Sequence, residues 1–408
     1  MLAAKPALGK FPDDKLAKLF ASLEGERHIT LAVSGGSDSM AMLRLAARLP
    51  DKKISALTVD HGLRAEAASE ALQVAAWCSG LAIDHCTLRW EGTKPKSGVQ
   101  AKARVVRYDL MSDWCRAHGV NYLLTAHTMD DQAETVLMRQ QRTSTLESLA
   151  GIWETSAWNG VKLFRPLLGQ SRSALRSYLI ELGQPWIDDP SNEDVTFERV
   201  RVRQALALEP ENSRERLADI ATGAGEKARA LATAADLWLH KHLPQFPEGY
   251  GAFPRTDFGE LPRELQRRVL QQAIQTYGAG SRADPHELDY LSAWIVGGTL
   301  TRKTLGGAIL AGRQSHILIG REWSRIGVAP IEIPRSGEVL WDGRFQLRGP
   351  ANSKVVAVGS LKGLTRRKDL PNFVQQGLPA VILPSGSLAI PHLGVGKAID
   401  VKFMGCLR

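Results

Sequence analysis

Short β-branched runs alternate with longer amphipathic stretches over the first half of the chain. This pattern predicts strands at 29–33, 54–59, 81–88 and 122–126, and helices at 40–48, 65–77, 101–118 and 130–142. Strands that alternate with helices are typical of βαβ units and of a parallel sheet. The first part of the chain is therefore expected to be an α/β domain built on a doubly wound, mostly parallel sheet.

The pattern changes near residue 213. Stretches rich in Ala, Leu, Arg and Glu predict helices at 214–243, 261–277 and 285–296. After Gly297 and Gly298, further glycines punctuate short β-branched runs, which favours a small, mainly β region with a helix or two. We therefore expect a catalytic domain at 1–212, a helical domain at 213–298 and a mainly β domain at 299–408.

Three of the predicted strands end in polar sequence, at 34–39, 60–62 and 127–131. In open parallel sheets, ligands bind outside the carboxyl ends of the strands, near the switch in strand order. The polar segments are therefore expected to meet at one edge of the sheet and to form the functional site there.

Composition narrows the class of protein. The chain has 408 residues, of which 44% are hydrophobic and 23% charged, the balance of a globular protein with two or three domains. No apolar run approaches the roughly 18–20 residues that span a bilayer. The first ten residues lack the apolar core of a signal peptide, so a cytoplasmic location without membrane contact is expected.

Charge and cysteine content point towards a polyanion partner and away from disulfides. Fifty-two Lys and Arg against 43 Asp and Glu give a net charge of +9. A basic surface favours nucleic acid, although many basic proteins bind none. The four cysteines include no Cys-x-x-Cys pair and no common zinc spacing, so they are interpreted as reduced thiols.

The segment between the first predicted strand and helix carries the strongest motif. It consists of Ser34, Gly35, Gly36, Ser37, Asp38 and Ser39. Glycines permit close backbone approach, and consecutive N–H groups at a helix start form a nest for an anion. The Gly-x-x-x-x-Gly-Lys pattern of a Walker loop is absent from the sequence. The alternative is an ordinary glycine-rich turn, but the six residues in this context favour phosphate binding.

This loop resembles the pyrophosphate loop (PP-loop) of the N-type ATP pyrophosphatases, which cleave ATP between the α- and β-phosphates. Segments at 59–64, 103–108, 125–135, 165–168 and 186–192 are similar to those of one branch, the tRNA(Ile)-lysidine synthetases. The matches run in order over about residues 29–203, half of the chain, and the later regions match more loosely. Two departures concern Thr128, where many relatives have a second histidine, and 142–145, where many have Arg-Gly-Ser-Gly.

The resemblance implies a PP-loop ATPase fold and an ATP-dependent ligase. Such an enzyme adenylates the C2 oxygen of the wobble cytidine in the CAU-anticodon isoleucine tRNA. Free L-lysine then attacks C2, AMP leaves, and codon reading changes from AUG to AUA. The implied cofactors are ATP and Mg2+, and the implied partners are tRNA(Ile) and free lysine. The oligomeric state is left open, with a homodimer among the options.

Four carboxylates are candidates for the chemistry. Asp38 lies beside the phosphates and would repel them without a cation, so it is expected to help hold Mg2+ with Asp131 or Glu134, unless it only caps the helix. Asp130, Asp131 and Glu134 open a helix, where carboxylates also interact favourably with the dipole. Because the lysine amine has a reference pKa of about 10.4, one of the three is expected to take its proton or bind the ammonium.

Arginines are candidates for binding anions. Arg104 and Arg107 lie three positions apart and so are adjacent on one helix, where they would clamp ATP phosphates or the adenylated base. Candidates for tRNA contact are Arg199, Arg201, Arg203, Arg366 and Arg367. For all of them, a solvated surface charge is the alternative.

Two other functions use the same loop. A PP-loop tRNA thiolase generally carries paired cysteines, and the scattered thiols of this sequence argue against sulfur transfer. A non-catalytic, nucleotide-binding RNA adaptor would bind ATP without releasing pyrophosphate. The presence of Asp38, Asp130, Asp131 and Glu134 together makes the ligase the favoured reading.

Overall fold

A computed structural model describes most of the chain in two compact units, Met1–Ala228 and Arg229–Arg408. The described residues are 11–62, 66–92, 94–95, 97–142, 145–188, 194–210, 212–278, 283–323, 329–364, 367–396 and 399–405. Among these residues, no helix has the length and apolar character needed to cross a membrane. The domain boundaries expected at 212 and 298 stay predictions.

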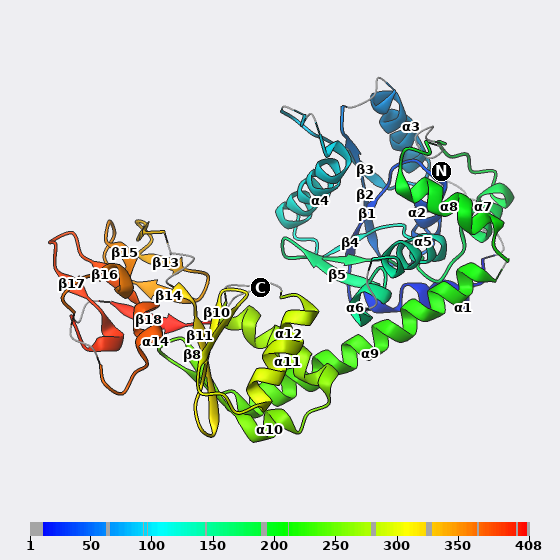
Figure 1. Cartoon of the computed structure of the whole chain (residues 1–408). Coiled ribbons are helices and arrows are strands. Elements are labelled where there is room, and N and C mark those ends of the chain that lie inside the picture. The colour runs from blue at the N-terminus through cyan, green and yellow to red at the C-terminus, as the bar shows by residue number, and fades with distance from the viewer. Residues whose placement is uncertain are drawn as a thin grey trace. The chain divides into compact units, whose positions relative to one another are not determined.

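The first unit is built on a six-stranded sheet of order β3-β2-β1-β4-β6-β5 (Figure 1). Its strands are β1 (His28–Ala32), β2 (Lys53–Asp60), β3 (Asp84–Arg89), β4 (Tyr122–Leu124), β5 (Thr155–Trp158) and β6 (Val161–Phe164). All neighbouring pairs are parallel except β5 and β6. Because β1 lies between β2 and β4, the strand order switches at β1, which is where ligands bind in such sheets.

Helices cover both faces of this sheet, which confirms the doubly wound fold. One face carries α2 (Ser37–Ala46), α3 (Ala67–Gly80) and α7 (Arg172–Glu181), whose apolar side chains pack on Ile29 and Leu31. The other face carries α4 (Val99–Ala117), where Tyr108 and Met111 pack against Leu57. Strand β1 is covered on both sides, since Ile29, Thr30 and Leu31 are all buried. Each fully buried Leu or Ile contributes about 1.5–3 kcal/mol to stability.

The sheet ends in a hairpin that the sequence pattern did not predict. Strands β5 and β6 pair antiparallel through a two-residue turn at Asn159 and Gly160, whose φ angles are +45° and +82°. An Asn-Gly pair is the preferred sequence for such a turn because both positions need positive φ. The Asn-Gly signal was therefore present, although the flanking strands are only four residues long.

Four more helices of the first unit lie wholly or partly after β4 in the chain. They are α5 (Met129–Gln140), α6 (Leu146–Leu149), α8 (Glu198–Leu208) and the start of α9 (Ser213–His242). Helices α5 and α8 pack through Ala133, Val202 and Leu206. The short α1 (Asp13–Leu19) and η1 (Ala21–Leu23) precede the sheet.

The second unit contains a five-stranded antiparallel sheet of order β7-β8-β11-β10-β9. The strands are β7 (Gln245–Phe246), β8 (Tyr250–Pro254), β9 (Arg302–Leu305), β10 (Ala308–Gly312) and β11 (His316–Arg321). Helices α10 (Arg255–Gly259), α11 (Arg263–Tyr277) and α12 (Pro285–Val296) pack against this sheet. Strands β7 and β8 lie in the region expected to be a helical domain, between two of its predicted helices, and β8 pairs with β11 across the boundary predicted at residue 298.

Two smaller antiparallel sheets follow, which confirms the mainly β character of the last region. One has the order β12 (Ile331–Glu332), β15 (Lys354–Ala357), β16 (Pro379–Ile382), β17 (Leu388–Ala389), and the other β13 (Glu338–Trp341), β14 (Phe345–Arg348), β18 (Asp400–Phe403). Short helices η3 (Val358–Ser360), α14 (Asn372–Gln376) and η4 (Pro391–Leu393) lie among them. Asp342, in the β13–β14 turn, pairs with Arg321 at 3.1 Å and with the fully buried Arg344 at 2.7 Å.

Candidate functional site

The loop between β1 and α2 carries the residues predicted to bind phosphate. Gly35 has a φ of +88°, and an added Cβ would lie 2.7 Å from Ile187 Cδ1, so a side chain here would be strained. Ser39 Oγ donates to Gly36 O at 2.9 Å and accepts from Ser34 N–H at 3.2 Å. Helix α2 begins after Gly36, and no described side chain caps it. The first-turn N–H groups lack intrahelical partners, which suits an anion.

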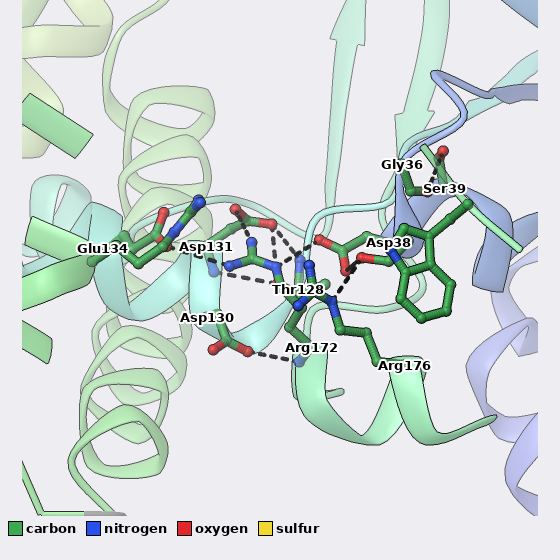
Figure 2. A network of polar contacts seen from close by, with 12 residues as sticks. Gly36, Asp38, Ser39, Thr128, Asp130, Asp131, Glu134, Arg172 and Arg176 are labelled. Carbon is green, nitrogen blue, oxygen red and sulfur yellow. Dashed lines mark hydrogen bonds and ion pairs between the residues drawn. The ribbon is translucent and has the colours of Figure 1, made fainter. Parts of the chain in front are cut away.

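Asp38 lies in the first turn of α2, and its carboxylate faces α7 (Figure 2). Its Oδ2 accepts from Arg172 Nε at 3.0 Å, and Ser37 Oγ donates to its Oδ1 at 3.4 Å. Burial raises the pKa of Asp38 above its ordinary value, although the Arg172 guanidinium acts in the opposite direction. The cap position belongs to Gly36, so the Asp38 carboxylate is not used as the helix cap.

Asp131 has two tasks at the start of α5. Its Oδ2 accepts from the Thr128 N–H at 2.8 Å and completes a capping box. Its Oδ1 accepts from Arg199 Nη2 at 2.9 Å and from Arg172 Nη2 at 3.2 Å. Burial alone would raise the pKa of Asp131, but Arg199 and Arg172 hold it below its ordinary value. The carboxylate is therefore both a helix cap and an anion that binds two cations.

Glu134 is the most buried acid of the group, with a side chain 2% exposed. Its Oε2 accepts from Arg199 Nε at 2.6 Å, and its Oε1 accepts from Arg203 Nε at 2.8 Å. Arg172 Nη1 lies 3.7 Å from Oε1. Helix α8 places Arg199 and Arg203 four residues apart, on one face of the helix.

Asp130 connects two further elements. Its Oδ2 accepts from the backbone N–H of Arg172 at 2.7 Å, at the start of α7. Its Oδ1 pairs with Arg214 Nε at 3.2 Å, in the first turn of α9. The four carboxylates are thus matched by four guanidiniums, those of Arg172, Arg199, Arg203 and Arg214. A ligand that brings more negative charge requires additional cations or a rearrangement of these pairs.

The two arginines of α7 were not predicted from the sequence. Arg172 contacts Asp38, Asp131 and Glu134, and Figure 2 shows it between the loop and the acidic residues of α5. Arg176 Nε donates to Ser37 Oγ at 3.3 Å. The available signal was an Arg-x-x-x-Arg pair directly after Ser171, which caps α7. That spacing alone does not distinguish a site from a solvated helix face.

Thr128 and His127 follow β4. Thr128 Oγ1 accepts from the Asp131 N–H as the N-cap of α5, which gives this departure from the family pattern a structural role. His127 Nδ1 lies 3.0 Å from Thr125 Oγ1. Burial lowers the pKa of His127 to about 3, so its imidazole is neutral at ordinary pH.

Arg104 and Arg107 lie on α4 and contact Tyr108 and His61, respectively. The Arg104 guanidinium lies 5.2 Å from the centre of the Tyr108 ring. Arg107 Nε donates to His61 Nε2 at 3.4 Å, close to the end of β2. Burial lowers the pKa of His61 to about 4, with Arg107 acting in the same direction. The roles of the two arginines in binding phosphate or base stay predictions.

Among the described residues, the other arginine candidates, Arg201 and Arg367, have partners of their own. Arg201 Nη1 donates to two backbone carbonyl oxygens just before α8, at 2.8 and 2.9 Å. Arg367 is paired with Glu248 at 3.2 Å and with Asp369 at 2.8 Å. Arg366 lies outside the described residues. Contact of Arg199, Arg201, Arg203 and these two residues with tRNA stays a prediction.

Comparison with known proteins identifies the family of this chain. The PP-loop domain family matches residues 11–209. The tRNA(Ile)-lysidine synthase of Ruegeria pomeroyi is 37% identical over 90% of this chain and 87% of its own length. The enzyme of that name from Wolbachia pipientis is 32% identical over 93% and 92%, respectively.

Solved structures of PP-loop proteins are more distant. The U34-tRNA thiolase NcsA from Methanococcus maripaludis aligns with a TM-score of 0.45 and 17% identity, over 52% of this chain and 78% of that chain. The family is therefore established by sequence, through identities above 30% that cover most of both chains. The chain belongs to the tRNA(Ile)-lysidine synthase family of PP-loop proteins.

Proposed function

We propose that the protein is an ATP-dependent ligase that joins free L-lysine to C2 of the wobble cytidine in CAU-anticodon tRNA(Ile). The observation that carries the proposal is the acidic group of Asp38, Asp130, Asp131 and Glu134 beside the loop at 34–39. A phosphate-binding loop next to carboxylates suits a reaction between a polyanion and a cationic amine. The family of this chain supports the same reaction.

The proposed reaction has two steps. In the first, the C2 oxygen of cytidine attacks the α-phosphorus of ATP, and pyrophosphate leaves. In the second, the lysine ε-nitrogen attacks C2, the C2–oxygen bond breaks, and AMP leaves with that oxygen. The N–H groups of the loop hold the phosphates, which keeps the α-phosphorus in line with the base. The base itself must leave its stack in the anticodon to reach this edge of the sheet.

The lysine substrate enters as an ammonium and must lose a proton before it attacks. Its positive charge matches the carboxylates at the start of α5. Asp130, Asp131 and Glu134 each hold guanidiniums in the structure, so binding of lysine would exchange one cation for another. We propose that one of the three binds the ammonium or takes its proton.

Magnesium fits this donor set. Asp38 and Asp131 bind the same guanidinium, at 3.0 and 3.2 Å, so their oxygens already meet around one positive charge. Among the described residues, no group of three or more His, Cys, Asp or Glu is arranged as a complete metal site. Magnesium commonly takes one or two carboxylates together with substrate phosphates. Bound there, it would neutralise phosphate charge, and Asp38 with Asp131 would hold it.

The cysteines do not support the thiolase alternative. Cys78 and Cys115 are buried, and burial raises the pKa of each thiol to about 11. A sulfur-transfer thiol needs the opposite, an exposed group with a lowered pKa. Cys86 is partly buried, and Cys406 lies outside the described residues.

The direct test is incorporation of radiolabelled lysine into unmodified tRNA(Ile) with Mg-ATP, beside the CAU-anticodon methionine tRNA as the matched control. We expect label in the isoleucine tRNA alone. Release of AMP and pyrophosphate without label would keep adenylation and require another nucleophile. A folded protein that cleaves no ATP would overturn the ligase and favour the RNA adaptor.

A further inference from the structure

Helix α7 presents two arginines to the phosphate-binding loop. Arg172 and Arg176 lie four residues apart on one face of this helix, which begins at the Ser171 cap. Arg172 Nε donates to Asp38 Oδ2 at 3.0 Å, and Arg176 Nε donates to Ser37 Oγ at 3.3 Å. Their partners are the first two residues of α2, where the unpaired N–H groups of the helix start lie.

The two arginines differ in how firmly they are held. The Arg172 side chain is 18% exposed and contacts three carboxylates, two of them by hydrogen bonds. The Arg176 side chain is 47% exposed, and its other contacts are Asp188 at 3.5 Å and the Trp186 ring at 5.8 Å. Arg176 is therefore free to turn towards a ligand, whereas Arg172 must give up carboxylates to do so.

Charge provides the reason for such an exchange. In the structure the Arg172 guanidinium takes the place between Asp38 and Asp131 that the proposed function gives to a magnesium ion. One guanidinium cannot neutralise these carboxylates and an incoming triphosphate together. A divalent cation or the substrate ammonium that takes over the carboxylates would release Arg172 towards the phosphates beside it. Guanidinium binds phosphate through paired N–H donors, which suits that second position.

We propose that Arg172 and Arg176 form a clamp for the pyrophosphate part of ATP, and that Arg172 enters the clamp by exchanging Asp38 and Asp131 for phosphate oxygens. This inference rests on the proposed use of ATP at the loop, and it adds two residues to those that would bind ATP. Before nucleotide binds, Arg172 acts as an internal counterion that keeps the carboxylates paired. On binding, both guanidiniums face the group that leaves in the first step.

The clamp is tested with inorganic pyrophosphate, ATP and AMP as separate probes in titration calorimetry on the full chain. Arg176→Gln and Arg172→Lys are compared with Arg116→Gln, which removes an exposed arginine from a surface pair on α4. Arg172→Lys keeps the charge that the carboxylates need, so it should fold. We expect pyrophosphate and ATP to bind about 10- to 100-fold more weakly to both α7 variants. AMP, which lacks the clamped phosphates, should bind within about twofold of wild type. Unchanged pyrophosphate affinity in both variants would overturn the clamp.

The exchange is tested in the absence of Mg2+ with Asp38→Asn. This variant frees Arg172 from one partner, so metal-free pyrophosphate should bind several-fold more tightly than to wild type. The double variant Asp38→Asn with Arg172→Gln separates this effect from the simple loss of a negative charge. If the double variant loses the increase in pyrophosphate affinity, the result supports the exchange of carboxylates for phosphate by Arg172. If the increase remains, that exchange is overturned. A chain that binds pyrophosphate through α7 but incorporates no lysine would leave the clamp intact and refute the ligase instead.

Discussion

Replacing Glu134 with glutamine should destabilise the first unit strongly. The substitution keeps the size of the side chain and removes the charge that Arg199 and Arg203 contact at 2.6 and 2.8 Å. The matched control is Glu198→Gln on α8, which removes the same charge from a pair with Arg142 at 2.6 Å. The two acids differ in exposure, since the side chain of Glu134 is 2% exposed and that of Glu198 is 36% exposed.

The size of the loss depends on how well water can hydrate Arg199 and Arg203 once the Glu134 carboxylate is removed. A hydrogen bond to a charged group contributes about 1.5–3 kcal/mol, and breaking a fully buried ion pair costs roughly 3–5 kcal/mol. Arg199 and Arg203 are 39% and 33% exposed, so water recovers part of the loss. We expect Glu134→Gln to lower the free energy of unfolding by about 2–3 kcal/mol. The exposed control pair should lose about 0–1 kcal/mol.

Hydrogen exchange measured on peptides from β1 and β4 isolates the first unit from the second. These central strands exchange only through its largest opening, so their rates report the stability of the unit. The expected loss corresponds to about 30- to 150-fold faster exchange in Glu134→Gln, against about fivefold or less in Glu198→Gln. Equal rates in the two variants would refute the reasoning, because the buried carboxylate would then stabilise no more than a surface one.

Four further predictions concern a loop glycine, a histidine, a buried ion pair and a basic cluster. Gly35→Ala should lower the free energy of unfolding by about 1–3 kcal/mol and weaken ATP binding, because the φ of Gly35 is +88° and an added Cβ would meet Ile187. The control is Gly36→Ala, whose added Cβ would lie 3.7 Å from the nearest atom, so its hydrogen-exchange rate should match that of wild type. Equal losses of stability in the two variants would contradict this prediction. Burial lowers the pKa of His61 to about 4, so between pH 6.5 and 4 the unfolded chain binds a proton that the folded chain does not, and stability falls as pH falls. His61→Asn should therefore flatten the dependence of unfolding free energy on pH, measured by denaturation at several pH values. An unchanged slope would contradict the prediction. Asp342→Ala should lower the free energy of unfolding of the second unit by about 3–5 kcal/mol, because it removes the carboxylate that pairs with Arg321 and the buried Arg344. Hydrogen exchange in peptides from β10 and β11 measures this loss. Asp342→Asn, which keeps an acceptor, should lose less stability, and a larger loss in Asp342→Asn than in Asp342→Ala would exclude the ion pair as the cause. Replacing Arg366 and Arg367 by Gln should weaken tRNA binding and make the slope of log affinity against log salt concentration shallower by about one for each residue that contacts a phosphate. An unchanged slope would show that these two residues do not contact tRNA phosphates.

Local patterns in the sequence determined the elements that a few consecutive residues can specify. The first strand, its glycine loop and the following helix were predictable because the β-branched run, the paired glycines and the helical spacing lie within 20 residues of one another. Helix α12 was predicted with the bounds Pro285–Val296 that it has, since proline starts it and Gly297 ends it. The reaction class also followed from the sequence, through motifs that the family shares.

Tertiary structure alone decided how the charges of the site are paired. Arg172 and Asp38 are 134 positions apart, and Arg199 reaches Glu134 across 65. No periodicity in either segment distinguishes these arginines from the exposed ones beside them. The pairing of β8 with β11 was equally hidden, because two short strands inside a helix-rich stretch become stable only against a sheet formed later in the chain. The sequence therefore identified the loop and its four carboxylates, whereas the packing of α5, α7 and α8 brought Arg172 among them and determined which cation each carboxylate holds.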